Sequence, residues 1–148
     1  MNKFLRHPAT NAVGLCVFSA FYAVMFLGFS DKITGAAGNA VGTFWRGWES
    51  FLIAGGHRIT AVVLIVITLA VLALLLIKHK PYDEYHTAIL IKCLSVSVIL
   101  TLLAIGVFFF LVLLDPTAFL SKFMLFTTIN WSTVILADLV YLLLCRRK

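Results

Sequence analysis

The chain has 148 residues, of which 62% are hydrophobic and 12% are charged, whereas about 25% of the residues of a soluble globular domain are charged. Its formal net charge is +6, but the basic residues flank apolar stretches and form no stripe with exposed aromatic residues, so we expect no nucleic-acid binding. The composition therefore argues against a soluble fold and predicts a single membrane domain over residues 1–148.

Four long apolar stretches cover residues of about 10–29, 59–77, 87–114 and 123–145. A helix needs roughly 20 apolar residues to cross the hydrocarbon core of a bilayer. Lipid offers an exposed backbone no hydrogen-bond partner, so each stretch should be helical. The sequence predicts an all-α fold, an integral membrane four-helix bundle.

The basic residues predict the orientation, because cytoplasmic loops carry an excess of lysine and arginine. With the N-terminus inside, the inner side holds seven basic residues and the outer side four: Lys3, Arg6, Lys78, Lys80, Arg146, Arg147 and Lys148 against Lys32, Arg46, Arg58 and Lys122. We expect a multi-pass protein of the bacterial cytoplasmic membrane with both termini in the cytoplasm. The first stretch exceeds the apolar region of a signal peptide, so we expect it to be retained.

Small residues gather on one side of the first stretch at helical spacing: Ala12, Cys16, Ser19, Ala20 and Ala23. Small side chains let helix backbones approach closely in lipid. This side is the expected packing face of the first helix.

Residues of about 40–53 show an amphipathic pattern between the first two spans. Val41, Phe44, Trp45, Trp48, Phe51 and Leu52 share one helical face, and Thr43, Arg46, Gly47, Glu49 and Ser50 share the other. This pattern predicts an interfacial helix on the outer side, anchored by Trp45, Arg46 and Trp48. Gly55 and Gly56 should then turn the chain into the second span. Two alternatives stay open: a lid over a cavity, or a re-entrant loop formed by the small residues 35–42.

The short connection at residues 78–86 predicts that the second and third spans are antiparallel neighbours. The third span carries a stripe with three small residues: Ala88, Lys92, Ser95, Ile99, Leu102 and Gly106. We expect this stripe to face the fourth span.

The fourth span is the most polar one, with Thr127, Trp131, Val134, Asp138, Tyr141 and Cys145 on one stripe. A carboxylate within a span costs on the order of 3 kcal/mol, so such residues face protein or a cavity and usually have partners. Lys92 lies at a depth similar to that of Asp138. The candidate intramembrane polar site is therefore Asp138, Lys92, Ser95, Tyr141 and Asn130.

The predicted Asp138–Lys92 pair has three interpretations. It could join two helices and fix their register. It could form a proton- or cation-responsive site, because a carboxylate beside a lysine can change its charge state. Lys92 could also extend to the headgroups, away from Asp138.

Motifs for catalysis, cofactors and metals are missing from the sequence: it has no HExxH, GxSxG, CxxC or phosphate loop. No two of the four histidines lie at matched depth within the spans, so we expect no haem. His79, His86, Asp83 and Glu84 could hold a metal, but a solvated loop explains them better.

We expect a non-enzymatic accessory or interaction subunit of a membrane assembly. One alternative is a homo-oligomeric small transporter or channel whose site includes Asp138 and Lys92, and a second is a lipid- or quinone-directed membrane enzyme. The expected partners are membrane lipid and either further copies of the chain or another membrane protein.

Overall fold

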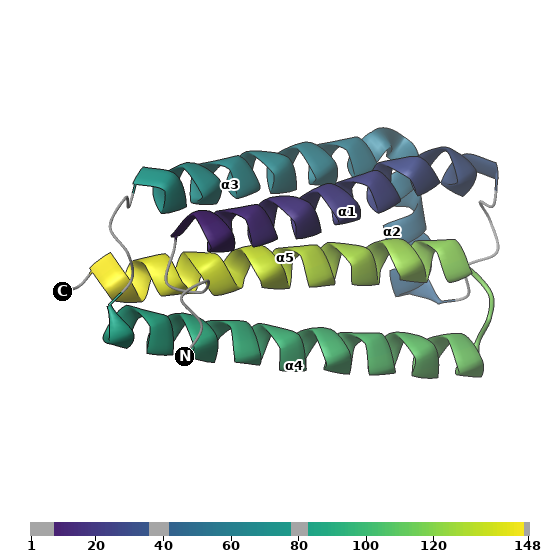
Figure 1. The fold of residues 1–148 in the computed structure, drawn as a ribbon. Coiled ribbons are helices and arrows are strands. Elements are labelled where there is room, and N and C mark those ends of the chain that lie inside the picture. The colour runs from purple at the N-terminus through teal and green to yellow at the C-terminus, as the bar shows by residue number, and fades with distance from the viewer. Residues whose placement is uncertain (1–7, 36–41, 78–82, 147–148) are drawn as a thin grey trace.

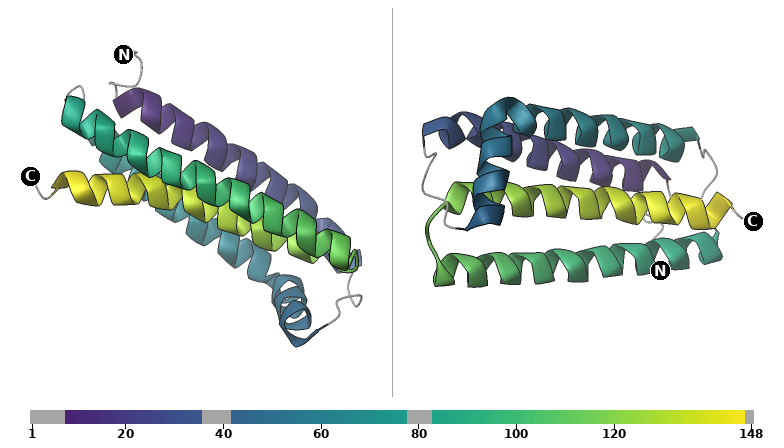
Figure 2. Two further views of the ribbon diagram at one scale, coloured as in Figure 1. Left: turned by 90° about the horizontal axis from the view of Figure 1, so that it is seen from below. Right: turned by 180° about the vertical axis from the view of Figure 1, so that it is seen from behind.

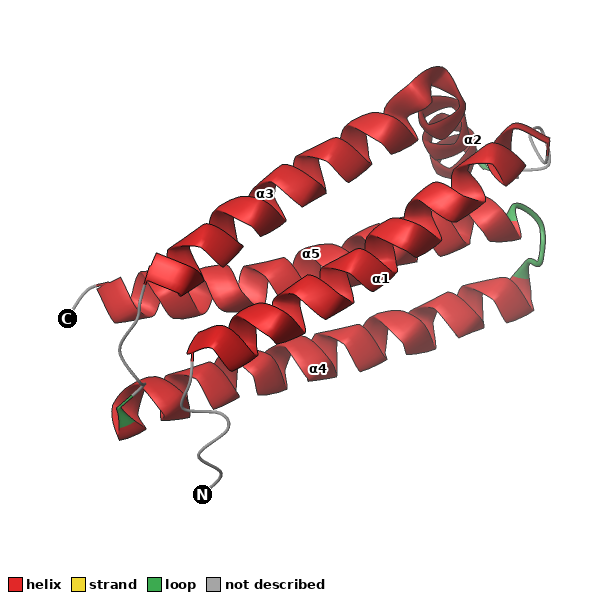
Figure 3. Ribbon diagram, turned by 45° about the horizontal axis from the view of Figure 1, so that its top comes forward, coloured by secondary structure: helices red, strands yellow, loops and turns green. Residues whose placement is uncertain are grey.

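The structure, a computed structural model, describes residues 8–35, 42–77 and 83–146. It contains α1 (Pro8–Gly35), α2 (Thr43–Phe51), a short π-helical segment η2 (Leu52–Gly56), α3 (His57–Ile77), α4 (Glu84–Leu114) and α5 (Phe119–Arg146). Within the described ranges there is no strand (Figure 3). The predicted all-α fold is confirmed.

Among the described residues, four helical segments are long and apolar enough to cross a membrane: Ala9–Phe29, Thr43–Ile77, Glu84–Leu114 and Phe119–Leu144. Each contains one of the four stretches predicted from the sequence, apart from residues at the stretch ends. These segments indicate a multi-pass membrane protein. The orientation of the chain stays a prediction.

The helices extend beyond the predicted spans because polar residues at their ends can also adopt or cap a helix. The carboxylate of Asp83 caps α4 by accepting a hydrogen bond from the backbone N–H of Glu84 at 2.7 Å, which satisfies one free donor of the first turn. At the other end, Asp115 adopts an extended backbone, as expected for a residue before a proline, here Pro116.

Helices α1, α3 and α5 contact one another and form a three-helix core, whereas the main contacts of α4 are with α5 alone (Figure 1). The prediction that the second and third spans are neighbours is wrong, because α5 lies between α3 and α4. The short loop between α3 and α4 keeps their connected ends close, but it does not require the two helices to pack along their length. The polar side chains of α5 favour a position surrounded by other helices, and α5 therefore lies between α3 and α4.

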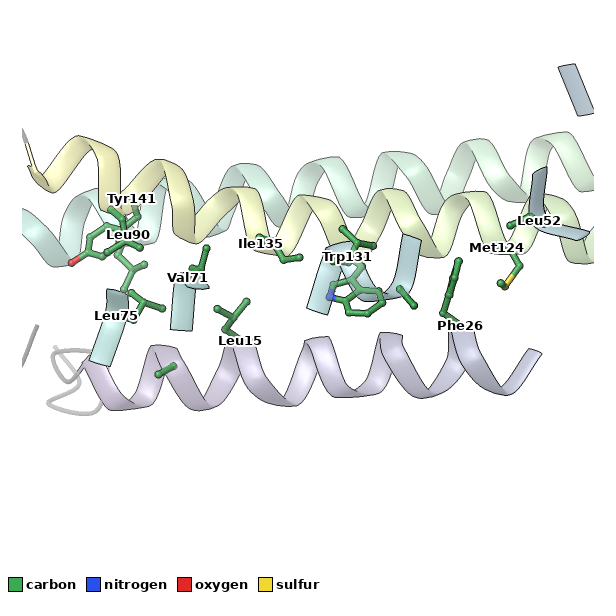
Figure 4. Close-up of a cluster of buried hydrophobic side chains, with 14 residues drawn as sticks. Leu15, Phe26, Leu52, Val71, Leu75, Leu90, Met124, Trp131, Ile135 and Tyr141 are labelled. Carbon is green, nitrogen blue, oxygen red and sulfur yellow. The ribbon is translucent and has the colours of Figure 1, made fainter. Parts of the chain in front are cut away.

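Large side chains fill the interior along α5 (Figure 4). Trp131, Tyr141 and Phe26 are all fully buried. Leu15 and Ile135 lie near Trp131, and Tyr141 packs at one end of the row. In lipid, helices associate through van der Waals packing and polar contacts and not through the hydrophobic effect. Tight filling around α5 is therefore what holds the core together.

The packing face of α1 differs in part from the predicted one. Ala12 and Ser19 are buried as expected, but Cys16 and Ala20 are exposed. Leu15 and Phe26 are buried at 2% and 0% exposure. The observed packing face contains both small and large residues. A prediction based on small residues alone therefore places the face at the wrong angle around the helix.

Helix α2 crosses the end of the bundle opposite to the start of α1 and the end of α5 (Figures 1 and 2). We call this the α2 end, and the opposite one the terminal end. The chain turns from α2 into α3 at Gly55, whose φ of 94° is in the left-handed region that favours glycine. The predicted glycine turn between the amphipathic helix and the second span is confirmed.

Candidate functional site

Asp138 lies inside the core, as predicted, but its partner comes from α1. The carboxylate is 2% exposed, and the side-chain Nδ2 of Asn11 donates to its Oδ1 at 2.6 Å. A hydrogen bond to a charged group is roughly twice as strong as a neutral one. The contact therefore joins the first and last spans at the terminal end.

Lys92 does not pair with Asp138: within the described part of the chain, neither a hydrogen bond nor an ion pair joins them. Lys92 and Ser95 are both exposed. The buried residues of α4 are Thr87, Leu90 and Ser97. The predicted Lys92–Ser95–Asp138 cluster is not formed.

The whole α4 stripe expected to face α5 is instead exposed: Ala88, Lys92, Ser95, Ile99, Leu102 and Gly106. The side of α4 toward α5 includes Ser97, whose hydroxyl donates to the backbone carbonyl of Thr133 at 3.4 Å. Helix α4 is apolar nearly all round, so its hydrophobic pattern does not mark an inner face. The spacing of small residues pointed to the wrong side.

The stripe on α5 does face protein, as predicted. Thr127, Trp131, Asp138 and Tyr141 are buried and Val134 is half-buried, while the side chain of Cys145 lies outside the described residues. Tyr141 follows Asp138 by three positions and therefore shares its helical face.

Asn130, also part of the predicted site, is 8% exposed. Its Oδ1 and the Nε1 of Trp131 have no hydrogen-bond partner among the described residues. Each buried unsatisfied group costs about 1–3 kcal/mol. These two atoms are the least satisfied polar groups of the described core.

A second polar contact joins α1 to α3, where the hydroxyls of Ser19 and Thr68 lie 3.5 Å apart. The hydroxyl of Thr68 also donates to the carbonyl of Leu64 at 2.8 Å. Both side chains are buried. Hydroxyls that bond across helices in this way help to set helix register in a membrane.

At the α2 end, the sequence did not predict a cluster around Lys122, which is 1% exposed. Its Nζ lies 3.0 Å from the Oδ2 of Asp115, donates to the backbone carbonyl of Asp115 and stands 5.6 Å from the centre of the Trp45 ring. A cation over an aromatic face is attracted by the ring's negative face. The cluster joins α2 to α5.

Asp115 lies between the spans and also accepts hydrogen bonds from the hydroxyl of Thr117 at 2.6 Å and its backbone N–H at 2.9 Å. The Thr117 hydroxyl, followed by the Lys122 ammonium, lowers the pKa of Asp115 to about 2. Asp115, which ends α4 before Pro116, thus also pairs with the ammonium group of Lys122.

The two tryptophans of the expected interfacial anchor contact the bundle. Trp48 donates its Nε1–H to the carbonyl of Ser121 at 2.9 Å, and Trp45 lies against Lys122, whereas Arg46 is exposed. Glu49, expected on the solvent face, is buried at 5% exposure. Residues from both the apolar and the polar side of α2 therefore contact the end of the bundle. The amphipathic pattern of the sequence does not reveal this, because it separates only lipid-facing from water-facing positions. The re-entrant alternative falls mainly on residues 36–41, outside the described ranges.

Asn11 is the functional candidate that sequence reasoning missed. Its signal was an amide near the start of the first span, on the same predicted side of the membrane as the end of the fourth span. Within the described ranges, no group of three His, Cys, Asp or Glu side chains could hold a metal ion. The suggested loop site lies partly outside those ranges, at His79.

A comparison of the chain with protein-family models, with curated proteins and with solved structures finds no match.

Proposed function

We propose that this chain is a non-enzymatic accessory subunit of a membrane assembly and that it binds its partner through the outward face of α4. The proposal places it in the bacterial cytoplasmic membrane with the terminal end in the cytoplasm. The orientation rests on the excess of basic residues at that end.

The observation that carries the proposal is the outward position of the α4 stripe. Ser95 and Gly106 are features of a helix–helix contact in lipid, because small and hydroxyl side chains permit close approach and hydrogen bonds between helices. No other described helix of this chain covers them. A helix from another chain is then the partner that this face suits.

A groove on this face supports the proposal. It is a shallow, open groove of about 470 Å³ lined by residues of α4, among them Leu102, Gly106 and Phe110. A bulky side chain of a partner helix would fill such a space, as knobs fill holes between packed helices.

The buried Asp138 also favours a structural role over chemistry. Its carboxylate is 2% exposed and bonded to Asn11, so in this conformation a substrate or ion would first have to break the contact. A bonded carboxylate of this kind fixes the register of α1 on α5.

Photo-cross-linking tests the proposal. A photoreactive residue at Leu102 of α4 should form a discrete adduct with a second protein in the membrane. The same residue at Val66 of α3 is the control, because the two positions are similarly exposed at 63% and 58%. Gly106→Leu should weaken the Leu102 adduct. Lipid adducts alone at Leu102 would contradict the proposal.

The second candidate is a homo-oligomeric transporter. It is favoured by Asn130 Oδ1 and Trp131 Nε1, which have no hydrogen-bond partner in the part of the chain that the structure describes. Buried polar atoms without partners suit a site that receives water or a polar guest. An adduct at Leu102 with another copy of the chain, together with liposome flux abolished by Asp138→Asn, would support this candidate. Flux that is insensitive to Asp138→Asn would remove the carboxylate from any transport mechanism.

A further inference from the structure

A second groove lies on the seam between α4 and α5 and has a volume of about 290 Å³. Val96 and Leu100 of α4 line one side, and Leu136 and Val140 of α5 line the other. Lys92 is the charged residue in its lining. The groove is therefore apolar with one ammonium group.

The position of Lys92 along α4 matches the boundary of the hydrocarbon core. The uncharged run from Cys93 to Leu114 has 22 residues, or about 33 Å of helix, against a core about 30 Å thick. Lys92 comes directly before this run, from where its long side chain can extend to the headgroups of the terminal end. Val96 and Leu100 follow one and two turns deeper.

The charge of Lys92 is not neutralised within the described part of the chain. Asp138, the acidic residue expected beside it, is buried and bonded to Asn11. No ion pair to Lys92 is found among the described residues, and Lys92 itself is exposed. Its ammonium is free to meet a negative group from outside the chain.

We propose that this groove binds an anionic phospholipid, with the lipid phosphate on Lys92 and an acyl chain along the seam. The ligand is defined by complementarity: a cation at headgroup depth, continued by an apolar groove toward the middle of the bilayer. The bound lipid contacts both α4 and α5. It therefore strengthens the attachment of α4, whose main contacts within the chain are with α5.

Native mass spectrometry of the intact chain from detergent micelles tests the charge. Phosphatidylglycerol and phosphatidylcholine with identical acyl chains are the probes, and the wild-type chain should retain the former preferentially. Lys92→Gln should reduce retention of phosphatidylglycerol about five-fold, the effect expected of one lysine near an anionic headgroup. Lys92→Arg should preserve retention, and Arg58→Gln, an exposed charge at the start of α3, is the control.

A second pair of variants tests the groove. Val140→Trp should fill it and displace phosphatidylglycerol although Lys92 remains. Val98→Trp is the control, an exposed position of α4 (58%) outside the lining. Equal retention of the two lipids by the wild type, or unchanged retention in Lys92→Gln or Val140→Trp, would overturn the proposal. So would a protein segment cross-linked into the groove from Val140.

These results are independent of the proposed partner on α4. The cross-linking position for the partner, Leu102, lines the first groove, whereas Lys92 and Val140 line the second. A chain that retains phosphatidylglycerol through Lys92 but shows no protein adduct at Leu102 would keep the lipid site and lose the accessory function.

Discussion

At the scale of single residues, the hydrogen bond from Asn11 to Asp138 explains how a carboxylate is held within a span. The donor lies in the first helix and the acceptor in the last, 127 positions apart. An ionised carboxylate without a donor at this depth would be strongly disfavoured. The hydrogen bond between the two side chains therefore stabilises the packing of α1 on α5.

We predict that Asn11→Ala destabilises the protein by about 1–3 kcal/mol, because it leaves a buried acceptor unpaired. Asp138→Asn should cost less, since an amide can still pair with Asn11. Unfolding in mixed micelles measures both free energies, with the exposed Val13→Ala (62%) as control. An Asn11→Ala protein as stable as the control would show that the contact contributes nothing.

Asp115 gives a prediction for pH. Its pKa is lowered from 3.8 to about 2, so its ionised form stabilises the fold. That contribution is present above pH 3.8 and is lost as the pH falls through about 2. Thermal unfolding between pH 5 and pH 2 should show this loss in the wild type relative to Asp115→Asn. Parallel curves would mean that the Lys122–Thr117 contacts do not hold the carboxylate.

At the scale of elements, the position of α2 depends on a close contact between Gly56, which follows the helix, and Phe51 at its end. A Cβ added at Gly56 would lie 2.5 Å from the backbone oxygen and the ring of Phe51. No real Cβ approaches that closely, so the turn between α2 and α3 requires glycine here. The docking of α2 also uses the Trp48–Ser121 hydrogen bond.

We predict that Gly56→Ala destabilises the α2 end by about 1–3 kcal/mol, the usual cost of forcing extra volume into a packed site. Hydrogen exchange of α2 amides should become faster. Gly47→Ala is a matched control, because its Cβ would have open space and alanine favours a helix. If exchange is equally fast in both variants, the close contact with Phe51 does not limit the turn.

At the scale of the whole molecule, α5 is the central helix and α4 lies on its outer side (Figure 1). Asp138, Trp131 and Tyr141 of α5 are buried, and Asp138 bonds to Asn11 of α1. The apolar α4 needs no such cover, because lipid is as good a neighbour for leucine as protein is.

This arrangement predicts which positions can be cross-linked. In a variant without the native cysteines, Ser97→Cys with Thr133→Cys should react with a short bifunctional thiol reagent, since these residues of α4 and α5 are in contact. Ser97→Cys with Val66→Cys of α3 should not react. A reverse result would place α4 against α3, as the short loop between them suggested.

The sequence by itself determined the spans, the glycine turn and the burial of the α5 stripe. An uncharged run of sufficient length favours a membrane-spanning helix, and a polar stripe within such a helix favours a position facing protein. Only the tertiary structure decided that Asp138 bonds to Asn11, that Lys92 faces outward and that α2 docks through Trp48. The physical reason is that depth in a membrane fixes the level of a residue but not its direction around the helix. On a helix as apolar as α4, only contacts with other helices fix that direction.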